Sequence, residues 1–328
     1  IVGGTGSGKS TLALYSYVYK PLQQLLGDPK LKIIYYSLEM SSEILFAKLL
    51  SIYIWETYGM ALSYKKLLGL HKKHILSEVE MAVVEDSLDW LHKVEEHMIV
   101  YDKSLNADKL KEHLENFLSS PKIGTFVDID ENQTKYIPVN PDMYVIVLVD
   151  HVRLLQFSGP SPKPEIDKAV KHLIYLRNKC GITVVLVQQQ NRNASGMDRR
   201  KGGYQDIELS DLSDTSDTAQ GSEYVIGIFN PKREKMSNYY DYRIKGGLGD
   251  KFRSISVLKN RFGVSDVSIG TAFYGEIGYF KELPLGDEMS EHDYNVVLNY
   301  LNTAVFLTDS KKPLEEEEIA GPDITFRM

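Results

Sequence analysis

The segment Gly3-Gly4-Thr5-Gly6-Ser7-Gly8-Lys9-Ser10 constrains this chain more than any other feature. It fits the pattern G-x-x-x-x-G-K-[ST] at every fixed position, and an amphipathic stretch follows at once. Glycines let the backbone curl so that successive N–H groups point at phosphate oxygens, and a helix N-terminus adds partial positive charge. The segment therefore predicts a phosphate-binding loop that leads into a helix starting at Lys9.

The residue types in this loop predict its chemistry. Lys9 would reach the β- and γ-phosphates of a nucleotide, and the Ser10 hydroxyl would bind Mg²⁺. The expected nucleotide-binding residues are Gly3, Gly4, Thr5, Gly6, Ser7, Gly8, Lys9, Ser10 and Thr11. A Gly-rich turn that merely starts a helix is the alternative interpretation.

Two carboxylates follow apolar strand-like runs. Asp150 closes the run MYVIVLVD and is the candidate second ligand for the Mg²⁺ water shell. Glu39 follows KIIYYSL, where a carboxylate at the C-terminal edge of a parallel sheet can orient and deprotonate an attacking water. The alternatives are a turn or helix cap for Asp150 and a helix-terminal carboxylate for Glu39.

Short β-rich runs alternate with longer helical stretches, which predicts an α/β fold with a mostly parallel sheet covered by helices. The expected strands are Ile33–Tyr36, Met143–Val149, Ile182–Val187, Tyr224–Phe229 and Ser254–Leu258. The expected helices are one from Lys9 that Pro21 bends or ends, and three more at Ser41–Tyr58, Asn106–Phe117 and Glu165–Lys179.

Residues 126–139 break this rhythm and predict an inserted β-hairpin, and a second hairpin is expected at the sheet edge near Gly270–Phe280. We expect one core over residues 1–307 and an acidic, flexible tail over 308–328. Because the chain starts at Ile1, two residues before the loop, we expect most of the preceding strand to lie upstream of this sequence.

Composition excludes several classes of protein. The 328 residues are 43% hydrophobic and 25% charged, which argues against disordered and fibrous chains. A net charge of −7 argues against a passive nucleic-acid coat, although basic groups on a few loops of a motor remain compatible with it. The longest apolar run is too short for a membrane span. The single cysteine favours a reducing compartment, such as a bacterial cytoplasm or that of a viral host.

Five further blocks resemble the DnaB-type (superfamily 4) replicative helicases, including phage versions. Ser37–Ser41 is similar to the family's "SLEMS" block. The later blocks follow in family order and span the chain to Gly263: a Walker B segment at Val147–Leu155 with His151 where Tyr is usual, a sensor "SQLNR" block at Val187–Arg192 with Gln188 in place of Ser, Ser210–Leu212 with Gln220 and Glu223, and "KQRNG" at Lys259–Gly263.

The resemblance implies a RecA-like P-loop NTPase core that hydrolyses ATP with Mg²⁺. Lys9 and Ser10 would bind phosphate and metal, Asp150 would be the Walker B carboxylate, and Glu39 the general base. Gln189 would sense the γ-phosphate and relay its state to the loop that follows. Arg261, with Lys259, would enter the neighbouring subunit's site as an arginine finger. Read from the residues alone, Lys259 and Arg261 lie two apart on one strand face and can present two cations to one phosphate.

The long segment after Gln189 is the candidate DNA-contacting region, because long loops are usually functional or disordered. The candidate residues are Arg192, Arg199, Arg200, Lys201, Ser213 and Asp214. The family has an Arg-Glu pair where this chain has Ser213-Asp214, so the basic groups and backbone amides become the expected phosphate contacts. A solvated loop is the alternative. A second basic loop, Lys245–Arg253, could face DNA, a subunit interface, or neither.

Two function classes compete. The first is a hexameric helicase that translocates on single-stranded DNA, with a primase or helicase loader as a further partner and no membrane. The second is a RecA- or KaiC-like assembly ATPase that forms an ATP-gated scaffold or filament. Both would use the phosphate loop, Asp150 and Glu39; the Ser37–Ser41 and Lys259–Gly263 blocks favour the helicase.

Overall fold

The computed structural model describes residues 1–70, 75–130, 133–190 and 207–309, with the backbone alone at 133, 213–217 and 301–309. One sheet of nine strands runs through this part of the chain in the order β13-β12-β11-β8-β1-β7-β6-β2-β3. Its strands are β1 (Val2–Gly3), β2 (Leu31–Ser37), β3 (Met98–Tyr101), β6 (Tyr144–Asp150), β7 (Thr183–Gln189), β8 (Tyr224–Phe229), β11 (Phe252–Asn260), β12 (Val267–Tyr274) and β13 (Tyr279–Glu282). The strands from β8 to β3 pair in parallel, whereas β11, β12 and β13 are antiparallel. The expected mostly parallel α/β sheet is confirmed.

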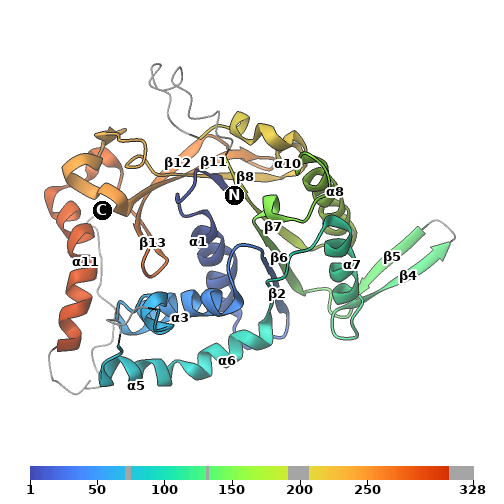
Figure 1. Ribbon diagram of the computed structural model, residues 1–328, viewed down its shortest axis with the longest axis horizontal. Coiled ribbons are helices and arrows are strands. Elements are labelled where there is room, and N and C mark those ends of the chain that lie inside the picture. The colour runs from blue at the N-terminus through green and yellow to red at the C-terminus, as the bar shows by residue number, and fades with distance from the viewer. Residues whose placement is uncertain (71–74, 131–132, 191–206, 310–328) are drawn as a thin grey trace.

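Helices cover both faces of the sheet (Figure 1). The larger ones are α1 (Lys9–Leu14), α2 (Lys20–Leu25), α3 (Ser42–Tyr58), α5 (Glu78–Asp86), α6 (Leu88–His97), α7 (Ala107–Leu118), α8 (Lys163–Cys180) and α11 (Glu291–Asp309). The shorter ones are α4 (Tyr64–Leu67), α10 (Ser216–Gly221), η1 (Tyr15–Tyr19), η2 (Val152–Leu154), η4 (Leu209–Thr215), η5 (Ile244–Leu248), η6 (Gly249–Lys251) and η7 (Gly286–Glu288). None of the helices in the described ranges is long and apolar enough to cross a membrane.

Alternation along the central strands builds two cores. In β2, Ile33 and Tyr35 pack into the core shared with α1 and α3, whereas Ile34 and Tyr36 pack into the core under α7 and α8. Successive side chains of a strand point to opposite faces, so a strand covered on both sides must be apolar throughout. This is why the central strands are continuous apolar runs and could be located from the sequence.

The first helix differs from its predicted form. It does not end at Pro21, because the helical path passes through the π-helical turn η1 and continues as α2 to Leu25. Pro21 lies in the first turn of α2. A residue in the first turn needs no N–H bond to the preceding turn, so proline is tolerated there. The other three predicted helices are present, and Gly181 ends α8 in the left-handed region.

Both predicted hairpins are present. The insertion forms β4 (Gly124–Asp130) and β5 (Gln133–Pro138), a separate two-stranded sheet that projects from the body beside α7 and α8 (Figure 1). Phe126 and Tyr136 pair across it, and Tyr136 is buried in the α7–α8 core. The edge hairpin is β12–β13. A further short pair joins β9 (Asn238–Tyr239) to β10 (Tyr242–Arg243).

Three parts of the fold were not predicted. Strand β3 adds an edge beside β2, helices α4 to α6 lead to it, and α11 packs near η5. Helix α11 runs to Asp309, past the boundary expected at residue 307, and residues 310–328 of the expected tail lie outside the described ranges. The division into a core and an acidic tail stays a prediction.

Candidate nucleotide site and finger strand

The glycine-rich loop joins β1 to α1 at the C-terminal edge of the parallel strands. Gly8 is the residue before α1 and has φ 105°, a left-handed value that L side chains rarely adopt. At Gly3 a Cβ atom would lie 2.6 Å from the Ile228 carbonyl oxygen, so a side chain does not fit. No side chain caps the N-terminus of α1, and its first-turn N–H groups are therefore the donors that a phosphate would receive.

The groups expected to hold metal and phosphate lie together. The Ser10 Oγ donates to Asp150 Oδ1 at 3.0 Å, and the Tyr35 hydroxyl donates to Asp150 Oδ2 at 2.8 Å. Asp150 is buried, and burial raises its pKa although both hydroxyls act in the opposite direction. Lys9 Nζ donates to the Gly4 carbonyl oxygen at 2.8 Å, and burial lowers its pKa. A hydroxyl and a carboxylate in contact beside a loop of free N–H groups fit a Mg²⁺-bound phosphate.

Glu39 lies at the same edge and faces solvent. Its side chain is 56% exposed, and its Oε2 lies 3.9 Å from His151 Nε2. Burial lowers the pKa of His151, so this imidazole is neutral near pH 7 and the contact is not an ion pair. The Leu38 N–H donates to the Asp150 carbonyl oxygen at 2.8 Å, which fixes the end of β2 to the end of β6. An exposed carboxylate held beside the loop is accessible to a water molecule.

The predicted sensor Gln189 contacts the phosphate loop. Its Nε2 donates to Thr5 Oγ1 at 2.5 Å, and the N–H of Gln190 donates to the Gly3 carbonyl oxygen at 3.0 Å. The Gln190 side chain in turn donates to Asp211 Oδ2 at 2.9 Å. Asp211 is buried at η4, beyond the segment proposed to contact DNA. The end of β7 therefore links the phosphate loop to the far side of that segment.

Arg233 was missed by the sequence reasoning. It follows β8, the parallel neighbour of β1, and its Nη1 donates to the Thr5 carbonyl oxygen at 3.0 Å. The guanidinium is exposed and so close to Gly6 that a Cβ there would lie 2.4 Å from Arg233 Nη2. A general signal existed, since loops that follow parallel strands line one edge of the sheet.

Arg253 closes the Lys245–Arg253 loop, for which DNA, a subunit interface or neither was expected, and its side chain faces neither. It is 2% exposed, and its Nε donates to the Ser7 carbonyl oxygen at 2.7 Å while its Nη1 bonds to Asp250 and Phe252 carbonyl oxygens. The guanidinium stacks on Phe273 at 4.5 Å, and burial lowers its pKa to about 10. Arg253 supports the phosphate loop from beneath.

Lys48 on α3 is a second cation close to the carboxylates. Its Nζ lies 3.3 Å from Met40 Sδ and 5.2 Å from the centre of the Tyr64 ring. Burial lowers the pKa of this ammonium, while Asp150 and Glu39 raise it. Its charge therefore adds to that of Lys9 around the two carboxylates. The sequence held no signal for it, since a lysine on an amphipathic helix is ordinary.

The two predicted finger residues have different environments. Lys259 Nζ donates to the carbonyl oxygens of Ala219, Gln220 and Ser222, at the C-terminal end of α10, at 2.8, 3.1 and 2.8 Å. A β-bulge between Val257 and Lys259 interrupts the register with β8 before this point. Lys259 thus caps α10 in its own subunit, where a cation is favoured.

Arg261 lies in the exposed turn after β11. Its backbone N–H donates to the Glu223 carbonyl oxygen at 2.9 Å, and its side chain has no hydrogen bond or ion pair within the described ranges. Because β11 is antiparallel to β8, Arg261 lies at the start of β8, whereas the phosphate loop lies at the opposite end. The side chain cannot reach its own phosphate loop.

The proposed DNA-contacting residues cannot be placed in the same way. Arg192, Arg199, Arg200 and Lys201 lie outside the described ranges, and so do the side chains of Ser213 and Asp214. The backbone of the latter two belongs to η4, which leads directly into α10.

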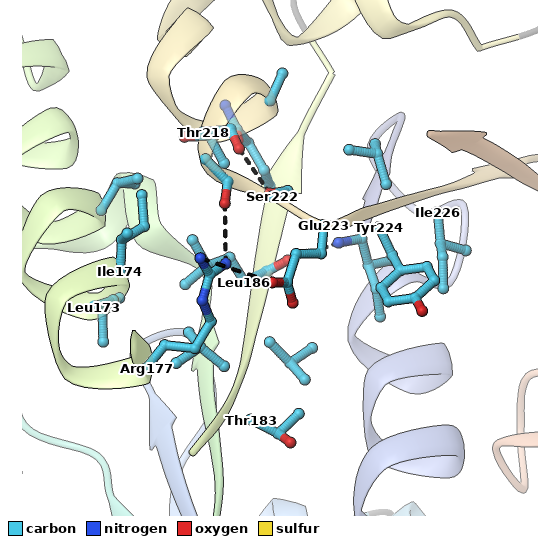
Figure 2. A pocket seen from close by; sticks show the side chains of 18 of the residues that line it. Leu173, Ile174, Arg177, Thr183, Leu186, Thr218, Ser222, Glu223, Tyr224 and Ile226 are labelled. Carbon is cyan, nitrogen blue, oxygen red and sulfur yellow. Dashed lines mark hydrogen bonds and ion pairs between the residues drawn. The ribbon is translucent and has the colours of Figure 1, made fainter. Parts of the chain in front are cut away.

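A cavity of 460 Å³ lies at the opposite edge of the sheet from the phosphate loop, where β7 and β8 run past the start of β1. Figure 2 shows Arg177 directed toward Glu223, with Thr218 and Ser222 of the α10 end nearby. Arg177 donates to the Gly221 carbonyl oxygen at 3.1 Å and lies 3.9 Å from the Glu223 carboxylate. Most other lining side chains are apolar, so the cavity holds none of the groups expected for nucleotide chemistry.

No protein-family profile matches the sequence, and no curated protein matches it. Among solved structures, the chain is similar to the isolated ATPase domain of a DnaB-like helicase, with a TM-score of 0.63 and 15% identity over 86% of this chain and 83% of that one. It is also similar to a DnaB-like replicative helicase whose structure describes its interactions with primase, with a TM-score of 0.62 and 16% identity. This chain has the fold of a helicase ATPase domain. The second match covers 86% of this chain but only 58% of the replicative helicase. The expected RecA-like α/β fold is confirmed.

Proposed function

We propose that this chain is the ATP-hydrolysing core of a ring-forming, DnaB-type replicative helicase that translocates on single-stranded DNA. The observation that supports this most strongly is the position of Arg261, exposed and at the edge of the sheet opposite Lys9. A finger so placed completes a nucleotide site only when a second copy of the chain lies against it. Shared sites of this kind belong to ring or filament assemblies.

The residues at the loop suit Mg²⁺-ATP as substrate. Ser10 and Asp150 would hold the metal, and Lys9 with the N–H groups of the loop would bind the β- and γ-phosphates. Magnesium, when bound there, supplies charge neutralisation at the phosphate oxygens. The raised pKa of Asp150 belongs to the free enzyme, and a cation beside the carboxylate would favour its ionised form.

Glu39 would act as the general base. Its exposed carboxylate takes a proton from the attacking water as the water oxygen bonds to the γ-phosphorus and the bond to the β-phosphate oxygen breaks, which releases ADP and phosphate. Neutral His151 lies close enough to help hold the carboxylate in place. Arg261 of a neighbouring copy would stabilise the negative charge that develops on the transferred group.

Gln189 would connect this chemistry to DNA. It contacts Thr5 of the phosphate loop, and the next residue contacts Asp211 on the far side of residues 191–206. A change at the γ-phosphate would therefore act on both ends of the proposed DNA-contacting segment. Arg192 and the basic run Arg199–Lys201 would supply its phosphate contacts.

The remaining partners follow from the same proposal. A hexamer is the assembly that we propose, and a primase or helicase loader would act on regions outside the ATPase core.

Strand separation distinguishes this proposal from an ATP-gated scaffold. A forked duplex with one labelled strand is incubated with the chain and ATP, and strand release is measured together with ATP hydrolysis with and without single-stranded DNA. We expect ATP-dependent release and faster hydrolysis with DNA, both absent in Lys9→Ala. Hydrolysis that DNA does not change, together with no strand release from assembled protein, would favour the scaffold.

A further inference from the structure

An exposed apolar surface surrounds the turn that carries Arg261. It consists of Tyr224, Phe262, Val264 and Val267, whose exposed fractions are 53%, 69%, 74% and 48%; we call it the finger-turn patch. Single exposed apolar residues are normal, but a contiguous group on a folded surface usually marks an interaction site. The Tyr224 and Phe262 rings are in contact, with centroids 6.0 Å apart, so the patch is continuous between β8 and the turn.

The turn holds these residues in a defined arrangement. Asn260 Nδ2 donates to the Val264 carbonyl oxygen at 3.1 Å, and the Phe262 N–H donates to Asn260 Oδ1 at 3.0 Å. The Arg261 N–H is fixed to the start of β8, and the Asp266 N–H donates to the Val257 carbonyl oxygen at 2.7 Å. A preorganised aromatic group beside an arginine is typical of interface hot spots, because little conformational freedom is lost on binding.

We propose that the finger-turn patch is the apolar anchor by which one copy of this chain docks on the phosphate-loop edge of the next copy. This inference rests on the proposed function, since a finger that acts in trans requires its turn to be buried against a neighbour. A second copy is the partner that fits, because Arg261 lies within the patch and has no ionic partner of its own in the described part of the chain.

The opposite edge offers an apolar counterpart. Leu154 and Phe157 follow Asp150 at the phosphate-loop edge and are 40% and 45% exposed. A ring needs a head-to-tail interface between two different surfaces of the same chain. The finger-turn patch at one edge of the sheet and these two residues at the other satisfy this requirement.

The test uses Phe262→Ala in the full chain. Assembly is followed by mass photometry and sedimentation with Mg²⁺-ATP across a range of protein concentrations, and ATP hydrolysis is measured in the same samples. We expect the concentration for half-maximal assembly to rise at least tenfold, as a hot-spot loss of about 1.4 kcal/mol would give. Hydrolysis per subunit should return to the parent value once the variant is assembled, because Phe262 is not a catalytic residue.

Two control variants separate this inference from the proposed function. Ile129→Ala removes a side chain that is 61% exposed on the β4–β5 hairpin and should assemble like the parent. Arg261→Ala should assemble like the parent and stay inactive at every concentration. Assembly of Phe262→Ala at the parent concentration overturns the anchor while leaving the helicase proposal intact. A parent chain that stays monomeric with nucleotide overturns both. Lost DNA binding with unchanged assembly would assign the patch to nucleic acid instead.

Discussion

Arg261 lies beside the first residue of β8, whereas Lys9 follows β1 beside the last residues of that same strand. The Arg261 N–H bonds to Glu223, and Gly3 pairs with Ile228, so five residue steps of strand separate the two positions, or roughly 17 Å. An arginine side chain does not span that distance. The separation makes a finger in trans the natural hypothesis for Arg261.

Glu39→Gln tests the general base. The amide keeps the size of the side chain but cannot accept the proton of the attacking water, so turnover should fall by about 10²–10⁴-fold. Binding of Mg²⁺-ATP should stay at the parent level, because Lys9, Ser10 and Asp150 are untouched. Fluorescent-nucleotide titration and steady-state hydrolysis measure the two effects. Turnover close to that of the parent would make Glu39 a helix-terminal residue only.

Asp150→Asn should stabilise the nucleotide-free protein while abolishing most hydrolysis. Burial raises the pKa of Asp150 above its usual 3.8, so the folded state is favoured by the protonated form and loses stability as pH rises through that raised value. Asparagine has no charge to bury. The melting temperature of the variant should therefore exceed that of the parent at pH 8, and the difference should shrink as pH falls toward 4. A variant less stable than the parent at pH 8 contradicts this account of the site.

Arg253→Met tests the support beneath the phosphate loop. The change removes a buried cation that donates to the carbonyl oxygens of Ser7, Asp250 and Phe252. Buried acceptors left without donors cost about 1–3 kcal/mol each, so we expect unfolding free energy to drop by about 3 kcal/mol and KM for ATP to rise. Denaturant titration and steady-state kinetics measure both. Exposed Lys245→Met is the control for loss of a positive charge from the same loop, and it should leave both quantities unchanged.

The sequence predicted those features whose signal is local. Strands β2, β6 and β8 are continuous apolar runs because both faces of each are covered, and the nucleotide-site residues lie at the ends of such runs. Strand β3 was missed because it has four residues and a partly exposed edge position. A short edge strand needs neither a long apolar run nor strict alternation.

Contacts between distant segments could not be predicted. Arg253 reaches Ser7 across 246 residues, and its glycine-rich surroundings suggested an exposed loop, whereas the side chain is buried. The bulge before Lys259 leaves no trace in an alternation pattern, and it precedes a lysine that bonds to α10. Both positions depend on where the β8–β11–β12 sheet meets its neighbours.

The basic run Arg199-Arg200-Lys201 remains the predicted DNA contact. Neutralising the three residues together should weaken binding of single-stranded DNA and flatten its dependence on salt. Each lost phosphate contact should reduce the log–log slope by about 0.7. Fluorescence anisotropy at several salt concentrations gives the slope. If it does not change, the contact lies elsewhere, and Lys245 with Lys251 would be examined next.

Mixing two inactive variants tests the shared site most directly. Arg261→Ala should retain nucleotide binding and lose turnover by about 10³–10⁵-fold, as expected for a finger residue, whereas Lys9→Ala keeps the finger and loses the phosphate loop. Mixed assemblies place an intact loop against an intact finger at some interfaces. We predict that ATP hydrolysis returns on mixing, depends on the ratio of the variants, and rises with protein concentration. Variants that exchange subunits freely yet recover no hydrolysis at any ratio would contradict the role of Arg261 in trans.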